Sequence, residues 1–473
     1  MAGNAASITE LYRPLDEAEV GRKHWLAVIT AGMGFFTDAY DLFIIGTVTV
    51  ILTPIFHLDT RQISLLNSIS LLASVGGALT FGKLMDRLGR KRMYGLEVAI
   101  LVVGALLSAF SWNFTSLLVF RVLVGFGVGG DYATSAVITS EYANKKARGR
   151  LVGTVFAMQG FGLLAGPAIA SIFIGAGVPN SLSWRLMLGL GAVPAASVIY
   201  LRRKIRETPR YTLGVKGDVT TTAETVRWVT GDRPLKGNRT TAASTNGTAG
   251  GRAGVRARLT SKPFLVRLIG TAGSWFLIDI AFYGNSVSSP LILKALQPHG
   301  TLLSHTLISL AIFAVAALPG YWVAVGLLDR LGRKRIQWQG FAVMAVAFAA
   351  IALIPGAAKN VWVFLVLFAI SYFFVEFGPN MTTFVFPSEI FPTSIRGTGD
   401  GISAAAGKFG AFLGALFVPT LLKSAGITGV EGVMAAVSVV GVILTLIALP
   451  EPMGQTLEHA SAEVGPAPVA AAV

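Results

Sequence analysis

Apolar residues in this chain form long continuous runs that are separated by short polar segments. Runs of about 20 residues have the length of helices that cross a lipid bilayer. Six runs precede a long polar interval and six follow it. The predicted spans are 25–52, 63–82, 94–111, 116–139, 151–175, 183–201, 264–290, 302–328, 337–356, 360–386, 397–422 and 429–449. The pattern predicts an all-α polytopic membrane protein with twelve transmembrane helices in two six-helix halves.

The polar interval divides the chain into segments with different expected roles. These are an N-terminal segment, a first half, a linker loop, a second half and a tail, at residues 1–24, 25–201, 202–263, 264–449 and 450–473. The linker is rich in Thr, Gly and Arg and poor in large apolar residues, so we expect a flexible loop without its own core. A short amphipathic piece at 223–228 could lie on the membrane surface, and the tail beyond Glu451 is expected to be disordered.

Composition narrows the class of protein. Hydrophobic residues make up 53% of the chain and charged residues 13%, whereas soluble domains average about 25% charged residues. The absence of cysteine excludes a disulfide framework and a thiolate metal site. We find no histidine pair at metal-ligand spacing, no nucleophile–base pair and no ATPase-type phosphate loop. The sequence therefore predicts no metal, no cofactor and no catalytic residue, and a membrane enzyme is the least favoured class.

The net charge of +15 is explained by membrane topology rather than by nucleic-acid binding. Basic residues gather in alternate loops, at 83–92, 145–150, 202–267 and 330–335, and are sparse in the loops between them. This asymmetry follows the positive-inside rule, which places both termini and the linker in the cytoplasm. We expect an integral protein of the cell membrane without a cleavable signal peptide.

Two motifs recur in the two halves. The sequence DRLGRKR stands at 86–92 and again, unchanged, at 329–335, each time after the second span of its half. A Ser-Glu pair followed by Arg-Gly occurs at 140–149 and again at 388–397. The repeats indicate two parallel halves of common ancestry, with a binding site at their interface near the membrane midplane.

These motifs resemble those of the major facilitator superfamily, and the resemblance covers essentially the whole chain. The repeated DRLGRKR is similar to the superfamily signature after the second helix. Three further motifs resemble those of the sugar-porter branch: RETPRY at 206–211, PSEIFPT at 387–393 and PE at 450–451. Three other segments resemble, more specifically, the phosphate:H⁺ symporter family. They are AGMGFFTDAYD at 31–41, the segment from GGDY at 129–132 to Ser-Glu at 140–141, and FGPN at 377–380.

The resemblance implies proton-coupled symport of inorganic phosphate by alternating access between the two halves. Its partners would be phosphate, protons and the lipid bilayer, and a monomer would suffice. This chain departs from the family pattern at Ala133 and Thr134, where Pro-Leu is usual. It departs again at Glu376, where an amide is expected; this places an ionisable group of unknown role near the site.

The candidate anion site combines neutral donors with one carboxylate and one lysine. Trp275, Asp279 and Tyr283 are spaced by four residues and share one helix face. An oxyanion in a low-dielectric cavity needs several donors and some positive charge, and a protonated Asp279 would donate rather than repel. The family resemblance implies that the matching positions bind the anion. The full predicted set is Tyr132, Gln159, Trp275, Asp279, Tyr283, Asn380 and Lys408.

Carboxylates in the first half are candidates for proton coupling, because ionisable residues at membrane depth are costly and usually functional. Asp38 and Asp131 are the main candidates and Asp41 is a lesser one. The alternative is that Asp38 or Asp41 forms a structural ion pair with Arg121. Arg121 is also expected as a structural or gating counter-ion of Asp131 or Asp38.

Charged residues at the cytoplasmic helix ends are expected to form gating ion pairs. They are Asp86, Arg90, Glu141, Arg148, Asp329, Arg333, Glu389 and Arg396. Alternatives to phosphate symport remain open. Gln, Asn, Trp and Tyr also suit the hydroxyl groups of a sugar, so a sugar/H⁺ symporter is the nearest rival. An organic-anion carrier and a phosphate sensor that moves no substrate are further alternatives.

Overall fold

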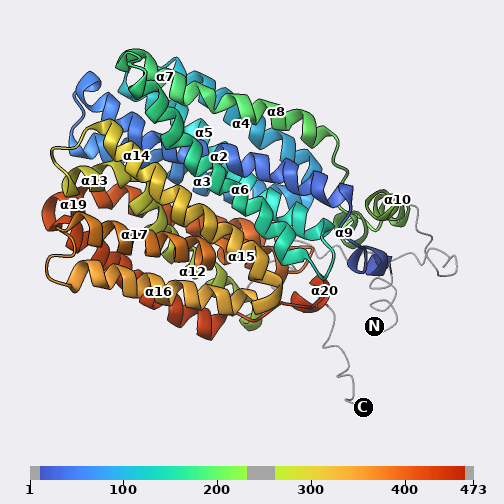
Figure 1. The fold of residues 1–473 in the computed structure, drawn as a ribbon. Coiled ribbons are helices and arrows are strands. Elements are labelled where there is room, and N and C mark those ends of the chain that lie inside the picture. The colour runs from blue at the N-terminus through green and yellow to red at the C-terminus, as the bar shows by residue number, and fades with distance from the viewer. Residues whose placement is uncertain (1–10, 232–260, 464–473) are drawn as a thin grey trace.

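The computed structural model describes residues 11–231 and 261–463, which fold into two helical bundles (Figure 1). The first bundle contains α2 (Arg22–Phe56), α3 (Thr60–Leu88), α4 (Arg90–Ala109), α5 (Phe114–Tyr142), α6 (Arg148–Gly175), α7 (Asn180–Leu190) and α8 (Ala192–Arg203). The second contains α12 (Lys262–Val287), α13 (Ser289–Leu296), α14 (Leu302–Ile312), η1 (Phe313–Ala317), α15 (Leu318–Leu331), α16 (Arg333–Leu353), α17 (Val361–Val375), η2 (Glu376–Asn380), α18 (Met381–Ile390) and α19 (Arg396–Ala448). In Figure 1 the blue-to-green bundle lies above the yellow-to-red one.

The predicted twelve-span architecture is confirmed within the described ranges. Eleven helical stretches there are long and apolar enough to cross a membrane. The longest, α19, is broken at Gly426, whose φ of 66° and ψ of −169° are not helical. Because a positive φ is easily adopted only by glycine, Gly426 turns the chain back and makes two spans of α19. The protein is therefore an all-α, polytopic membrane protein.

The repeated DRLGRKR motif makes the same turn in both bundles. Gly89 and Gly332 have φ values of 101° and 89° and lie between consecutive helices, α3–α4 and α15–α16. Glu207 accepts from the backbone N–H of Arg90 at 3.1 Å, and Glu451 accepts from that of Arg333, also at 3.1 Å. A carboxylate at the N-terminus of a helix satisfies unpaired N–H groups and favours the helix dipole. The motif and the two acids therefore form one repeated structural unit.

The same motif joins the two bundles. Asp86, at the end of α3, accepts from the backbone N–H of Gly397 at 3.1 Å and of Thr398 at 2.7 Å, at the start of α19. Asp329, at the end of α15, accepts from the N–H groups of Gly149 and Arg150 at 3.0 and 2.8 Å, at the start of α6. Each aspartate thus caps a helix of the other half. This pseudo-symmetric exchange holds one end of the two bundles together.

The linker and the tail contain more structure than the sequence predicts. Helices α9 (Pro209–Gly214) and α10 (Val219–Thr230) lie in the linker and contact each other, and α10 also contacts α2. The tail contains α20 (Leu457–Ala460). These elements lie at one end of the bundles, which we call the linker end (Figure 1). The expectation of a structureless linker and tail is therefore wrong for 209–230 and 457–460, and for 232–260 and 464–473 it lies outside the described residues.

Buried polar contacts explain why these segments are ordered. Arg210, at the start of α9, donates from Nε to Glu458 of α20 at 2.9 Å and from Nη2 to Asp16 at 2.6 Å. The hydroxyls of Thr212 and Thr222 are 2.7 Å apart and join α9 to α10. A buried arginine shared by two carboxylates fixes the segments that carry them. The composition of the linker does not predict this, because it depends on partners far away in the sequence.

Candidate functional site

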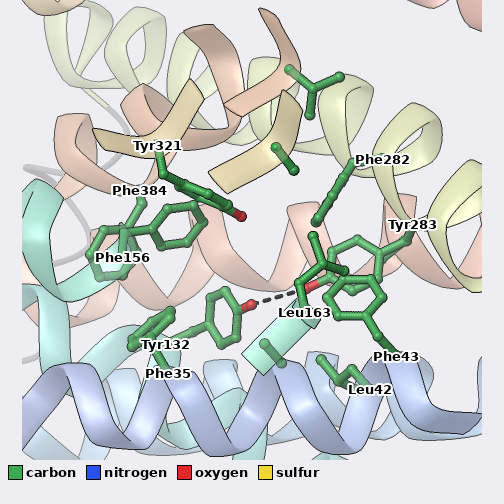
Figure 2. Close-up of a cluster of buried hydrophobic side chains, with 14 of the residues drawn as sticks. Phe35, Leu42, Phe43, Tyr132, Phe156, Leu163, Phe282, Tyr283, Tyr321 and Phe384 are labelled. Carbon is green, nitrogen blue, oxygen red and sulfur yellow. Dashed lines mark hydrogen bonds between the residues drawn. The ribbon is translucent and has the colours of Figure 1, made fainter. Parts of the chain in front are cut away.

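Tyr132 of α5 and Tyr283 of α12 meet at the boundary between the two halves, with hydroxyl oxygens 2.9 Å apart (Figure 2). Tyr132 Oη donates to Gln159 Oε1 of α6 at 3.0 Å, and Lys408 Nζ of α19 donates to Tyr283 Oη at 2.8 Å. Because a lysine ammonium can only donate, the hydrogen-bond chain runs from Lys408 through Tyr283 and Tyr132 to Gln159. Four predicted site residues are thereby brought into one network.

Lys408 supplies the positive charge at this network. Its side chain is 1% exposed and its Nζ lies 3.2 Å from Asp279 Oδ2. Nζ also lies 3.8 Å from the ring centre of Tyr132 and 4.2 Å from that of Tyr283. Cation–π contacts and a paired carboxylate are what a desolvated ammonium group requires. Gly407 allows the close approach of Trp275, because a Cβ at residue 407 would lie only 2.4 Å from the indole ring.

Two buried donors of the predicted set have no acceptor of good hydrogen-bond geometry within the described residues. They are Gln159 Nε2 and Trp275 Nε1, and both side chains are completely buried. Asp279 Oδ1 is likewise without a partner of good hydrogen-bond geometry there, although the indole N–H of Trp275, one turn earlier on α12, interacts with this carboxylate. Buried polar atoms are nearly always satisfied, so unpaired donors in one place call for an explanation. An oxyanion would provide an acceptor for Gln159 Nε2, and it would compete with Asp279 for the indole N–H of Trp275.

Asn380 lies beside this network in the second half. Its Nδ2 donates to Glu376 Oε2 at 2.5 Å and to Tyr321 Oη at 3.1 Å. The π-helical turn η2 presents Glu376 and Asn380 together, and it is packed tightly because a Cβ on Gly378 would lie 2.4 Å from the Cα of Gly340. Tyr321 was missed by the sequence analysis, since no motif marks it.

Aromatic rings enclose the polar centre (Figure 2). Phe35 lies 4.7 Å from Tyr132 and 4.8 Å from Phe384, measured between ring centres, and Phe156 stacks on Phe384 at 4.7 Å. Phe43 stacks on Tyr283 at 5.2 Å. The rings remove the site from water and thereby strengthen its electrostatic interactions.

A second cluster of charges lies within the first half. Arg202 of α8 donates to Glu97 Oε1 and to Asp131 Oδ1, both at 2.7 Å. These three side chains and Asp38 line one small cavity, together with residues that include Gly34 and Thr37. Ser135 donates to Asp131 Oδ1 at 2.7 Å. The structure thus brings the two main proton-coupling candidates, Asp38 and Asp131, to one buried place.

The expected partner of Asp131 and Asp38 differs from the observed one. Arg121 lies 3.6 Å from Asp41 and donates to the carbonyl oxygen of Asp41 at 2.9 Å, so it forms the structural ion pair that was the alternative for Asp41. Arg202 takes the role expected of Arg121 at Asp131. The predicted first half ends at residue 201, but α8 continues to Arg203. Arg202 was therefore assigned to the linker although it is buried in the bundle.

The predicted gating residues gather at the linker end. Glu141 accepts from Arg90 of its own half and from Arg396 of the other half, both at 3.0 Å. The counterpart acid, Glu389, pairs within its half with Arg333 at 2.8 Å. Arg148 forms no direct ion pair with either acid within the described residues, although it interacts electrostatically with Glu389; it lies 3.8 Å from Asp16 and donates to the carbonyl oxygen of Gln455 at 3.0 Å. Asp86 and Asp329 are near Arg90 and Arg333, at 3.4 and 3.0 Å.

The opposite end of the two bundles is also closed. Ser171 of α6 donates to Thr306 of α14 at 3.3 Å across the boundary between the halves. A Cβ on Gly46 of α2 would lie 2.4 Å from the carbonyl oxygen of Val287, at the end of α12. The central network is therefore enclosed by contacts at both ends, as in an occluded state.

Comparisons with known proteins agree with this arrangement. Residues 26–463 match the model of a family described as sugar (and other) transporter. Low affinity inorganic phosphate transporter 8 of Medicago truncatula is 36% identical, covering 95% of this chain and 92% of the relative. Inorganic phosphate transporter 1-4 of Arabidopsis thaliana is also 36% identical, covering 96% of each.

Solved structures share the fold. A structure of the major facilitator superfamily proton:xylose symporter XylE superposes with a TM-score of 0.80 at 20% identity, covering 94% of this chain and 100% of that chain. A partially occluded inward open structure of the xylose transporter XylE from E. coli gives 0.70 at 19% identity, covering 91% and 99%. At this identity the similarity shows the fold alone.

Proposed function

This chain belongs to the sugar (and other) transporter family, and from that premise we propose that it transports inorganic phosphate across the membrane together with protons. The observation that carries the proposal is the unpartnered buried donor Gln159 Nε2, together with the indole N–H of Trp275 at Asp279, beside a buried lysine. The phosphate transporters that resemble this chain over nearly its whole length support phosphate as the anion.

Coupling would arise from the ion pair between Lys408 and Asp279. While Asp279 is ionised, it neutralises Lys408 at 3.2 Å and repels a nearby anion. When Asp279 takes up a proton, the charge of Lys408 becomes available to phosphate, and the carboxylic acid can donate a hydrogen bond. Proton binding and anion binding then favour each other, which is the thermodynamic content of symport.

The cluster in the first half would hold a further proton. Asp38, Asp131 and Glu97 provide three carboxylates, whereas Arg202 supplies one positive charge close to them. Like charges in one low-dielectric site cannot all be ionised cheaply, so at least one carboxylate is expected to carry a proton. We assign Asp38 and Asp131 to proton transfer, and Arg121 and Asp41 to a structural pair.

Alternating access would require the contacts at the two ends to open in turn. At the linker end, the capping contacts of Asp86 and Asp329 and the Glu141–Arg396 pair would break together. We propose that this end faces the cytoplasm and that the protein lies in the cell membrane with both termini inside, as the charge asymmetry of the loops indicates.

Uptake of radiolabelled phosphate into proteoliposomes tests the proposal. With an inward proton gradient we expect phosphate to accumulate, and we expect Asp279→Asn and Lys408→Ala to abolish accumulation. Excess unlabelled phosphate should compete, whereas glucose and sulfate should not. Accumulation of labelled glucose instead would assign the site to a sugar, and binding of phosphate without transport would favour a sensor.

A further inference from the structure

Three buried carboxylates of the second half have no role in the mechanism above. One of them, Asp400, faces Asp86 and Arg396 at the linker end, and the other two lie further from that end. Glu376 of η2 and Glu431 of α19 are completely buried, and each has one carboxylate oxygen without a hydrogen-bond partner among the described residues. No ion pair with either is found in the described ranges. An unpaired ionised carboxylate is very costly away from water, so a buried acid of this kind is held as the neutral, proton-carrying form.

Glu376 lies next to the anion site. Asn380 Nδ2 donates to both Glu376 Oε2 and Tyr321 Oη, so Glu376 accepts a hydrogen bond from a residue of the predicted site. The titratable groups that face it are Tyr321 of α15, Asp279 of α12 and, one turn earlier on its own span, Tyr372. None of these can neutralise a negative charge, which distinguishes Glu376 from Asp279 with its lysine.

Glu431 lies further toward the end opposite the linker. It follows Gly426 closely, where α19 turns back, and its Oε2 accepts from Asn285 Nδ2 of α12 at 3.3 Å. Tyr372 is the titratable group facing it from α17. The hydroxyl of Tyr372 lies 2.9 Å from that of Ser286, the residue after Asn285. Tyr372, with Ser286 beside it, therefore faces both acids, although neither acid is hydrogen-bonded to these two hydroxyls within the described residues.

We propose that Glu376 and Glu431 are the proton-binding groups of a second proton pathway, which runs through the second half from the end opposite the linker to the anion site. A proton would bind Glu431, pass by way of the hydroxyls of Ser286 and Tyr372 to Glu376, and leave when the linker end opens. Only O–H bonds form and break. The inference rests on the proposed function, and it adds protons to those carried by the cluster at Arg202.

The decisive measurement is the number of protons moved per phosphate. Purified full-length protein in proteoliposomes would be assayed for labelled phosphate and, with a pH-sensitive dye, for protons. Phosphate counterflow, the exchange of labelled for unlabelled phosphate at equal pH on both sides, would be measured as well. It reports phosphate binding and exchange without net proton flux. The variants are Glu376→Gln and Glu431→Gln, and the matched control is Glu224→Gln, the same change at an exposed position on α10.

We expect counterflow to persist in both variants, since a neutral amide resembles the protonated acid. The proton-to-phosphate ratio should fall in Glu376→Gln, and gradient-driven uptake should slow by about tenfold in Glu431→Gln with a flatter pH profile. The control should match the wild type. If Glu376→Gln binds no phosphate, its proton-to-phosphate ratio cannot be measured. The inference is then tested by Glu431→Gln, because Glu431 lies away from the anion site.

Two outcomes overturn the inference alone. One is that the wild type transports phosphate and that both variants have the same proton-to-phosphate ratio and the same pH profile of uptake as the wild type. The other is uptake driven by a sodium gradient at equal pH and lost in Glu431→Gln, which would make the acids a sodium site. A wild type without phosphate counterflow would instead overturn the proposed function, and the inference with it.

Discussion

Tyr132 and Tyr283 share a hydrogen bond of 2.9 Å across the boundary between the two six-helix halves. Each hydroxyl is tied to its own half, Tyr132 to Gln159 and Tyr283 to Lys408. In the proposed cycle the halves separate on one side of the site at a time. The contact between the two tyrosines would then be exchanged for contacts with the anion.

Removing one of these hydroxyl groups should weaken phosphate binding more than it slows transport. For Tyr132→Phe we expect KM to rise by about fivefold to tenfold, because one net hydrogen bond contributes about 1 kcal/mol. Initial rates of uptake over a range of phosphate concentrations provide the measurement. In the double variant with Tyr283→Phe the two losses should not add, because the hydroxyls are in contact; strict additivity would contradict a shared role.

The Lys408–Asp279 pair should be sensitive to the removal of one partner. Lys408→Ala leaves a buried carboxylate unpaired, which costs about 3–5 kcal/mol when the acid stays ionised. The variant should unfold at a lower temperature in detergent than the wild type. Adding Asp279→Asn should restore most of the stability without restoring phosphate accumulation. A double variant as unstable as Lys408→Ala would argue against the pair as the cause.

Arg202 should matter to both stability and coupling, although the sequence analysis assigns it to the linker. Arg202→Ala leaves Glu97 and Asp131 without their cation, so we expect a lower melting temperature and loss of gradient-driven uptake. Arg203→Ala, the neighbouring exposed arginine, is the matched control and should behave as the wild type. Equal effects of the two substitutions would mean that the net charge of the loop, rather than the buried cluster, is responsible.

The ion pairs at the linker end should control access from that side. Met85 is completely buried and packs against Gly397 of the other half. Because the chain has no cysteine, a Met85→Cys reporter would give labelling without background. Adding Glu141→Gln removes the carboxylate shared by Arg90 and Arg396, so labelling by a thiol reagent should become faster. An unchanged labelling rate would show that the pair does not hold this end closed.

The docking of the tail should depend on pH in the acidic range. Burial by itself raises the pKa of Glu458, but Arg210 at 2.9 Å outweighs this effect and holds the pKa below its usual value. A lowered folded-state pKa stabilises the protein above the unfolded value of about 4.3, and this contribution is lost as the pH falls through the folded value. Melting temperatures of the wild type and Glu458→Gln should therefore differ at neutral pH and converge in acid. A constant difference across that range would contradict the pairing.

The twelve spans, the duplication and most of the residues at the centre can be predicted from the amino-acid sequence alone. A membrane-spanning helix can be recognised from consecutive residues, because a segment in lipid must satisfy its backbone hydrogen bonds within itself and must be apolar along its length. The repeated DRLGRKR marks both copies of a turn that only glycine allows at Gly89 and Gly332. The family resemblance added Trp275, Asp279 and Asn380, which the spacing of residues alone does not assign to an anion.

Which charged side chains contact one another becomes known only from the folded structure. Arg202 follows the apolar run of its span and therefore resembled a loop residue, yet α8 extends two residues beyond the predicted span and carries Arg202 to Asp131. Tyr321 and Glu431 have no neighbouring motif, and their partners come from helices distant in the sequence. Whether two side chains touch depends on how neighbouring helices are rotated and displaced along their axes, and those positions are fixed by the packing of the whole bundle.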